Sequence, residues 1–265
     1  MTCALPILTI DAIFGTGLSR EVKGIYSLAI TIINENSKYI LSIDVPSGFE
    51  CNSGKVMGNC IKSNKTVTFE LYKKGFLGYD TDSFTGEIVI EGIGIPRSVV
   101  DKFHENEYIM DIEFIKGILK KRNKYSHKGD YGRTLVLAGS LGFTGAAYIS
   151  TQAAVRSGAG LVTLGCDSSI QYILSGKLVE AMTASTNDEK RLDSLITNSN
   201  CIAIGPGLGN NQGTLNLLRK VLLNSKCPVV IDSDGLNVLE GNLEMLKNRS
   251  CPIVLTPHKI GRAHV

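Results

Sequence analysis

The sequence lacks several features that would place it in a specialised class of protein. It has no tryptophan and only seven prolines in 265 residues. No apolar run approaches the roughly 20 residues that a membrane-spanning helix needs. Its seven cysteines include no CxxC pair, which argues against a zinc ribbon or a disulfide framework and favours reduced thiols. The formal net charge is only +3, too small to indicate nucleic acid binding by itself.

What the chain does contain is typical of a globular protein. Hydrophobic residues make up 43% and charged residues 20%, a balance that excludes an intrinsically disordered chain. At about 150 residues per domain, the length predicts one or two domains that can each bury a core. The first ten residues lack the basic segment and cleavage motif of a signal peptide. We therefore expect a cytoplasmic homo-oligomer that binds neither membranes nor nucleic acid.

The two ends of the chain differ from the rest. Residues 2–7 read TCALPI and residues 260–265 read IGRAHV. The DNA segment ACGTGTGCTCTTCCGATC encodes the first peptide. Its reverse complement, shifted in frame and extended by one base, encodes the second, and the segment resembles a common sequencing adapter. We interpret both peptides as adapter-derived and exclude them from fold reasoning. Coincidence is the alternative, and nucleotide data without these strings would contradict the interpretation.

The first part of the chain, residues 8–96, predicts a small α/β unit. Apolar residues at helical spacing predict a helix over residues 22–34. Four apolar runs predict strands at residues 8–14, 39–45, 65–71 and 87–95. Alternating strands and helices predict a mainly parallel sheet that is covered on its faces. The polar residues 97–110 are expected to form a linker.

Residues 111–259 restart the same alternation. The segments TLVLAGS, LVTLGC, CIAIGPGLG, CPVVIDSDGLNVL and CPIVLTPH each begin as an apolar strand, and most end in glycine or polar residues. In open parallel sheets, ligands bind beyond the carboxyl ends of the strands. Glycine-rich loops that lead into helices suit phosphate groups, although glycine is also common in ordinary tight turns. Asp232 and Asp234 could be helix caps, and His258 could be a loop histidine or a ligand contact.

Two acidic residues lie near predicted strand ends in the first half. Asp11 stands in an otherwise apolar strand, where a charge is costly unless it is paired, hydrogen-bonded or bound to a cation. Asp44 precedes a Pro-Ser-Gly turn, where it could equally be a cap. Together with the GTGLSR loop and Arg20, these acids favour a site for an anionic ligand and a cation. The basic residues 120–133 are interpreted as a solvated helix end and a substrate-facing loop, because no nucleic acid-binding motif accompanies them.

The motifs resemble two families in series. DAIFGTGLSR, IDVPSGFE and TVTFELYKKG resemble the NAD(P)H-hydrate epimerase domain. HKGDYGR, AGSLGFTGAA, AAVRSGAGLVT, GPGLG, DSDGLN and LTPH resemble the ribokinase-like NAD(P)H-hydrate dehydratase domain. The resemblance implies a partial Rossmann-like domain at residues 8–96, followed by a partial ribokinase-like α/β domain at residues 111–259. It covers nearly the whole chain between the two end peptides.

This resemblance implies a repair reaction. Damaged NADH or NADPH carries water added across the nicotinamide ring, as R and S epimers. The first domain would interconvert the epimers. The second would remove water from the S form with ADP or ATP as co-substrate and Mg²⁺. K⁺ is the implied cation of the epimerase site.

Site residues follow by motif. Asp11 and Ser47 match potassium-linked positions, and Asp44 matches the acid/base, which also contacts the hydrate. Ala146 (or Ala147) and Gly207 (or Gly205) match hydrate contacts, as does His258. The loop that contacts the hydrate in the first domain corresponds to Gly15, Thr16, Gly17, Leu18, Ser19, Arg20 and Glu21.

The sequence also departs from the family pattern. An upstream Asn-Asn-Gly-Gly-Asp-Gly loop and a downstream Gly-Thr-Gly-Asp motif are absent, and Lys259 replaces the proline expected after TPH. We therefore expect little dehydratase activity from this polypeptide. The alternatives are a ribokinase-like kinase of a vitamin-type small molecule and a non-catalytic nucleotide-binding module. Phosphate transfer to such an alcohol would identify the first, and nucleotide binding without turnover the second.

Overall fold

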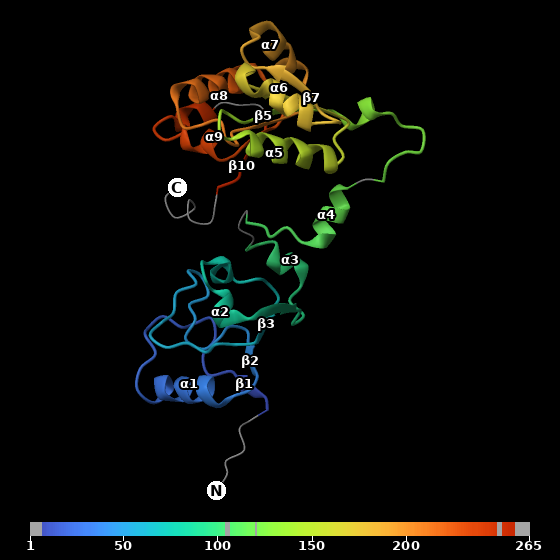
Figure 1. The fold of residues 1–265 in the computed structure, drawn as a ribbon. Coiled ribbons are helices and arrows are strands. Elements are labelled where there is room, and N and C mark those ends of the chain that lie inside the picture. Colours follow the sequence, from blue (N-terminus) through green and yellow to red (C-terminus); the bar gives the residue numbers. More distant parts are fainter. Residues whose placement is uncertain (1–6, 104–106, 120, 248–250, 258–265) are drawn as a thin grey trace. The chain divides into compact units, whose positions relative to one another are not determined.

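The computed structural model describes residues 7–103, 107–119, 121–247 and 251–257 (Figure 1). The chain divides into two compact units, Met1–Phe114 and Ile115–Val265. Both contain parallel sheets with helices, which confirms the predicted α/β class. Apart from Ile7, the end peptides interpreted as adapter-derived lie outside the described residues. Within the described ranges, no helix is long and apolar enough to cross a membrane.

The first unit is built on a four-stranded parallel sheet in the order β1-β2-β3-β4. Ile30 of the first helix packs with Ile40 of β2, Val22 and Ile61 in one core cluster. Ile10 of β1 is 60% exposed, so the predicted cover of both faces is incomplete here. The elements are β1 (Thr9–Asp11), α1 (Ile25–Asn36), β2 (Ile40–Ile43), β3 (Lys65–Phe69), η1 (Lys74–Leu77), α2 (Asp82–Thr85), β4 (Glu87–Glu91) and α3 (Arg97–Val100).

The first two strands are shorter than the sequence predicts, for reasons visible in the backbone. β1 ends at Asp11, and the Phe14 N–H donates to the Ser47 hydroxyl rather than to a neighbouring strand. β2 ends at Ile43 because Asp44 has a φ of 67°, a left-handed conformation that cannot continue a strand. The helix begins at Ile25 instead of residue 22, since Val22 is a buried loop residue whose N–H donates to Met57.

The second unit has a six-stranded parallel sheet in the order β10-β9-β8-β5-β6-β7. Helix α4 (Ile112–Ile118) spans the division between the units. The elements after it are η2 (Lys128–Tyr131), β5 (Arg133–Leu137), α5 (Thr144–Arg156), β6 (Leu161–Cys166), α6 (Ser168–Lys177), β7 (Met182–Ser185), α7 (Glu189–Asn198), β8 (Cys201–Ile204), α8 (Gln212–Asn224), β9 (Val229–Ile231), α9 (Asp234–Asn237), η3 (Leu243–Leu246) and β10 (Ile253–Leu255).

Helices cover both faces of this second sheet (Figure 1). Side chains of β5 alternate between the faces: Leu135 and Leu137 pack with α7 and α8, whereas Val136 packs with α5 and α6. Three of the helices begin at a side-chain cap, because an oxygen of Asp167, Asp188 or Asn211 accepts a backbone N–H of the first turn.

Candidate functional site

The carboxyl ends of β1, β2 and β3 lie at one edge of the first sheet, because these strands are parallel and in register. Asp11 is the last residue of β1, and Asp44 directly follows β2. Two loops lead away from the same edge, residues 15–21 after β1 and the Pro-Ser-Gly turn after β2. The fold therefore gathers the acidic residues predicted for the first half at one edge of the sheet.

Asp11 and Ser47 are in direct contact. The Ser47 hydroxyl donates to Asp11 Oδ1 at 2.6 Å, and the Ser47 N–H donates to Oδ2 at 2.8 Å. The Ser42 hydroxyl also donates to Oδ2, at 2.7 Å. All three residues are buried, and within the described chain no lysine, arginine or histidine forms an ion pair with Asp11. The site thus holds a buried carboxylate whose partners are hydroxyl and amide groups.

Asp44 is held by the strand beside it. Its Oδ1 lies 3.0 Å from the Lys73 ammonium and accepts hydrogen bonds from the Thr68 hydroxyl and the Phe69 N–H, both at 3.1 Å. Burial alone would raise the pKa of Asp44, but Lys73 and the two other donors together lower it below its ordinary value. Left-handed backbone at a non-glycine residue is strained and is often found at functional sites.

The loop over residues 15–21 is largely exposed. Neither Gly15 nor Gly17 has a positive φ, and a Cβ at either position would meet no atom within 4 Å. Gly48 differs, because its φ is 98° and a Cβ there would lie 2.0 Å from the Asn59 carbonyl oxygen. Packing therefore explains the glycine at 48 but not those at 15 and 17, where the missing side chains leave open space above the backbone.

The second unit has a topological switch point between β5 and β8. From β5 the chain continues to β6 on one side of the sheet, and later returns through β8 on the other side. A ligand site is expected where two such loops diverge. A Cβ on Gly207, in the loop after β8, would lie 2.9 Å from the Ala146 Cβ at the start of α5. The structure brings the predicted residues Ala146 and Gly207 together at this point.

The neighbouring alanine and glycine have structural roles. Ala147 is fully buried, and a Cβ added to Gly139 would lie 2.7 Å from the Cβ of Ala147. A Cβ on Gly205 would lie 1.8 Å from the Asp232 carbonyl oxygen, so this glycine allows the loops after β8 and β9 to touch. Ala147 and Gly205 thus pack inside the unit, whereas Ala146, in the first turn of α5, faces Gly207 in the loop after β8.

Asp232 and Asp234 do not cap a helix, so the capping interpretation is wrong. Asp232 Oδ1 accepts from the Thr256 hydroxyl at 2.7 Å, which links the loops after β9 and β10. Asp234 Oδ2 accepts from the Gly209 N–H at 2.8 Å, which links the loops after β9 and β8. The N-cap residue of α9 is Ser233, and its side chain makes no capping hydrogen bond. The two carboxylates therefore fix three strand-end loops against one another.

A cavity of about 580 Å³ opens near the same switch point. It lies beyond the carboxyl ends of four adjacent strands, β8, β5, β6 and β7. Residues from each of the four loops line it, among them Leu208, Ser140, Asp167 and Thr186. The Ser140 hydroxyl donates to the Gly207 carbonyl at 2.8 Å, which joins one wall of the cavity to the Ala146–Gly207 contact. His258 lies outside the described residues.

Comparison with known proteins finds relatives for both parts of the chain. Residues 3–75 match the family described as YjeF-related protein N-terminus, and residues 134–261 match the family described as NAD(P)H-hydrate dehydratase. Bifunctional NAD(P)H-hydrate repair enzymes of Moorella thermoacetica and Coxiella burnetii are each 36% identical to the chain, over 95% and 94% of its length. The chain belongs to this two-part family of NAD(P)H-hydrate repair enzymes.

The match has a limited extent in the relatives. The chain spans about half of their length, 49% of the Moorella protein and 50% of the Coxiella protein. A ribokinase-like superfamily protein of Enterococcus faecalis superposes with a TM-score of 0.51 and 27% identity, covering 59% of this chain and 57% of that one. The fold of the second unit is therefore ribokinase-like, as the resemblance implied. Neither the vitamin-type kinase nor the non-catalytic module is favoured by these matches.

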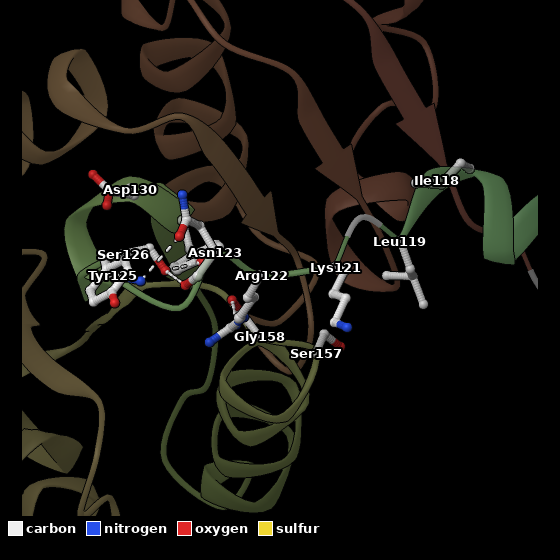
Figure 2. Close-up of a pocket in the computed structure, with 11 residues that line it drawn as sticks. Ile118, Leu119, Lys121, Arg122, Asn123, Tyr125, Ser126, Asp130, Ser157 and Gly158 are labelled. Atoms are coloured by element: carbon white, nitrogen blue, oxygen red, sulfur yellow. Dashed lines mark hydrogen bonds between the residues drawn. The ribbon is translucent and has the colours of Figure 1, made fainter.

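The chain has a second cavity of about 600 Å³, lined by residues between Ile118 and Tyr131 and by Ser157 and Gly158 (Figure 2). Arg122 lies over the Tyr131 ring and donates to the Gly158 carbonyl, just past the end of α5. Tyr131 precedes β5 and Gly158 precedes β6, so this cavity is at the amino ends of the strands. Residues 121–131 of the basic stretch therefore lie away from the strand-end loops of their own unit, which does not support the substrate-facing interpretation.

Sequence reasoning missed Lys73 and Thr68 as partners of Asp44. The pair Asp44–Lys73 is separated by 29 positions, and only the pairing of β2 with β3 brings the two residues together. Lys73 stands in the TVTFELYKKG motif, which carried part of the family resemblance. The lysine in that motif was therefore the one sequence signal that could have pointed to Lys73 as a functional residue.

Proposed function

We propose that the first unit interconverts the R and S hydrates of NADH and NADPH, and that the second belongs to the machinery that dehydrates the S form. The observation that carries the first assignment is Asp44, an ionised carboxylate at the carboxyl edge of a parallel sheet, the edge from which the exposed glycine loop also leads away. The proposal is supported by 36% identity to two proteins that are named for this repair.

Asp44 is the acid/base of the proposed epimerisation. Inverting the carbon that carries the added hydroxyl group requires a proton to leave and return. The lowered pKa keeps the Asp44 carboxylate ionised near neutral pH, ready to take the hydroxyl proton of the hydrate. As that proton leaves, the C–N bond of the hemiaminal carbon would open to an aldehyde and its electron pair would pass to the ring nitrogen. Re-closure on the other face of the aldehyde, with return of the proton, would give the inverted epimer. Residues 15–21 would contact the hydrate, and their open glycine positions would let its phosphates approach the backbone N–H groups.

Asp11 and Ser47 would hold K⁺. The fit rests on the Asp11 carboxylate, which is buried without an ion-pair partner in the described chain, and on the adjacent Ser47 hydroxyl. Carboxylate and hydroxyl oxygens are hard ligands of the kind that alkali and alkaline-earth cations prefer. A bound K⁺ would offset the buried charge and supply a positive field next to the anionic substrate.

In the second unit, Ala146, Gly207 and His258 would contact the S hydrate, and ADP or ATP with Mg²⁺ would activate its hydroxyl group. The contact between Ala146 and Gly207 at the switch point supports the choice of these two residues over Ala147 and Gly205. Mg²⁺ is commonly carried by the phosphates of a nucleotide, so no acidic cluster of the chain is assigned to it.

The test separates the two activities. A mixture of R and S NADPH hydrate is incubated with the purified chain and a separate dehydratase specific for the S form. Consumption of the R epimer faster than in the reaction without the chain supports epimerisation, and Asp44→Asn should abolish the excess. An R epimer consumed at the background rate would overturn the first assignment. Return of NADPH absorbance with ATP and Mg²⁺, without the added dehydratase, reports the second activity.

A further inference from the structure

The Asp44 carboxylate is bound on one side only. Within the described residues, every hydrogen bond and ion pair found on it ends on Oδ1, and none ends on Oδ2. The Asp44 side chain is 20% exposed, so the carboxylate is accessible from outside the core. The partners therefore fix the orientation of the carboxylate and leave one oxygen open.

The Lys73 ammonium has its three donors committed. It lies 3.0 Å from Asp44 Oδ1, and donates to the Phe69 carbonyl at 2.9 Å and to the Leu71 carbonyl at 3.1 Å. An ammonium group has three N–H bonds, so none remains for a substrate. The two carbonyls face Lys73 because the chain turns sharply after β3, where Glu70 has a φ of 59°. Lys73 is only 17% exposed, and little water competes for it.

We infer that Lys73 is a positioning residue for the proposed epimerisation: it anchors Asp44 Oδ1 so that Oδ2 alone is presented to the hydrate. This inference rests on the proposed function of Asp44. Lys73 itself transfers no proton in this arrangement, since its donors point to the protein. The proton of the hydrate hydroxyl moves to Asp44 Oδ2 as the hemiaminal C–N bond opens and its electron pair passes to the ring nitrogen. It returns from Oδ2 when that bond re-forms on the opposite face, so the protein ends the cycle unchanged.

Charge and geometry act together in this role. The lowered pKa of Asp44, to which Lys73 contributes, keeps the carboxylate in its basic form. Among the described residues, the Cys51 thiol also feels both charges; its pKa is raised, mainly by burial, and it stays neutral. Loss of the Lys73 charge should therefore raise the pKa of Asp44, and loss of its anchor should let the carboxylate rotate.

The test compares Lys73→Met and Lys73→Arg with Lys74→Met in the full chain. Lys74 is the adjacent lysine, is largely exposed and pairs with Glu107, so its variant removes the same charge one position further along the chain. The first measurement is the carboxyl ¹³C titration of Asp44, assigned with Asp44→Asn. We expect a higher Asp44 pKa in Lys73→Met, and the wild-type value in Lys74→Met. An unchanged pKa in Lys73→Met would overturn the inference, whether or not the chain is an epimerase.

The second measurement is epimerisation as a function of pH. Lys73→Met should lower kcat by about tenfold or more with a smaller change in KM, and should move the acid limb of the profile to higher pH. Lys73→Arg keeps the charge and should restore the position of that limb, with kcat between the two. Equal loss of kcat in both Lys73 variants without a shift of the limb would reduce Lys73 to a packing role and contradict the inference. Circular dichroism of each variant establishes that it is folded.

Discussion

Asp11 is a buried carboxyl group whose oxygens accept hydrogen bonds from the Ser42 and Ser47 hydroxyl groups and from the Ser47 N–H. An ionised carboxylate removed from water is unfavourable unless its oxygens accept enough hydrogen bonds. Ser47 is the main partner, because its hydroxyl and its N–H reach different oxygens of Asp11. The Ser47 oxygen in turn accepts the Phe14 N–H, so one side chain joins the ends of β1 and β2.

Ser47→Ala should therefore destabilise the first unit. The substitution leaves Asp11 with one donor fewer and the Phe14 N–H without its acceptor, which should lower the free energy of unfolding by about 1–3 kcal/mol. Ser83→Ala is the control, because the one partner of that exposed hydroxyl in the described part of the chain is the Asp80 carbonyl, and a change within about 0.5 kcal/mol is expected. Urea denaturation measures both. Equal stability of the two variants would show that the Ser47 hydroxyl is not needed to satisfy Asp11.

Cys60 should be an inert thiol in the folded protein. Burial, and to a lesser extent the Asp11 charge, raises the pKa of Cys60 to about 12. Since the thiolate is the reactive form, the smaller thiolate fraction alone should slow labelling at pH 8 by about 1,000-fold relative to the unfolded chain. The raised pKa also means that stability falls as pH rises from about 9 toward 12. Iodoacetamide labelling followed by mass spectrometry checks this, and rapid labelling of folded Cys60 would contradict it.

At the scale of elements, the loops after β5, β8, β9 and β10 form one connected group. Gly205 lets the loop after β8 lie against the Asp232 carbonyl, and the Asp234 and Asp232 carboxylates tie the loops on either side. The contact of Gly205 with the Asp232 carbonyl leaves no room for a side chain at position 205. The strand-end loops are thus held by backbone proximity as much as by side-chain hydrogen bonds.

Gly205→Ala should disrupt this group. Its φ of 130° is unfavourable for alanine, and the added Cβ would lie 1.8 Å from a backbone oxygen that cannot move freely. We expect a loss of about 2–4 kcal/mol in the stability of the second unit. Gly176→Ala is the matched control: it lies in α6 with nothing within 4 Å of the added Cβ, and stability should be unchanged or raised by up to about 1 kcal/mol. Chemical denaturation that ranks the two variants equally would refute the close contact.

Among the strands of the described residues, all but β7 could be predicted from the sequence, as could their parallel direction and the polar loops at their carboxyl ends, because apolar runs and glycine positions are local signals. The short segment of β7, Met182–Ser185, contains no apolar run and was missed. The ends of β1 and β2 could not be predicted, since they depend on where Asp11 and Asp44 find partners in other segments. The hydrogen bond of Asp232 with Thr256 and the ion pair of Lys73 with Asp44 could not be predicted for the same reason. Both act across loops that become neighbours only through strand register.

At the scale of the whole molecule, each core belongs to one unit. Among the described residues, the two clusters around Phe49 and Ile30 lie in the first unit, and those on the two faces of the sheet of β5 to β10 lie in the second. Residues 107–119 and 121–127, which lie between these cores in the sequence, are mostly exposed. Residues that share a buried core unfold together, so we expect each unit to unfold cooperatively by itself.

Thermal unfolding should therefore show two transitions that respond to different substitutions. Ser47→Ala should lower only the transition of the first unit, and Gly205→Ala only that of the second, each by several degrees. Limited proteolysis should first cleave within residues 107–127 and release two fragments that keep their secondary structure. Differential scanning calorimetry of the three proteins makes the comparison. A single transition lowered by both substitutions would mean that the units fold as one, and that the epimerase-like and dehydratase-like halves cannot be studied apart.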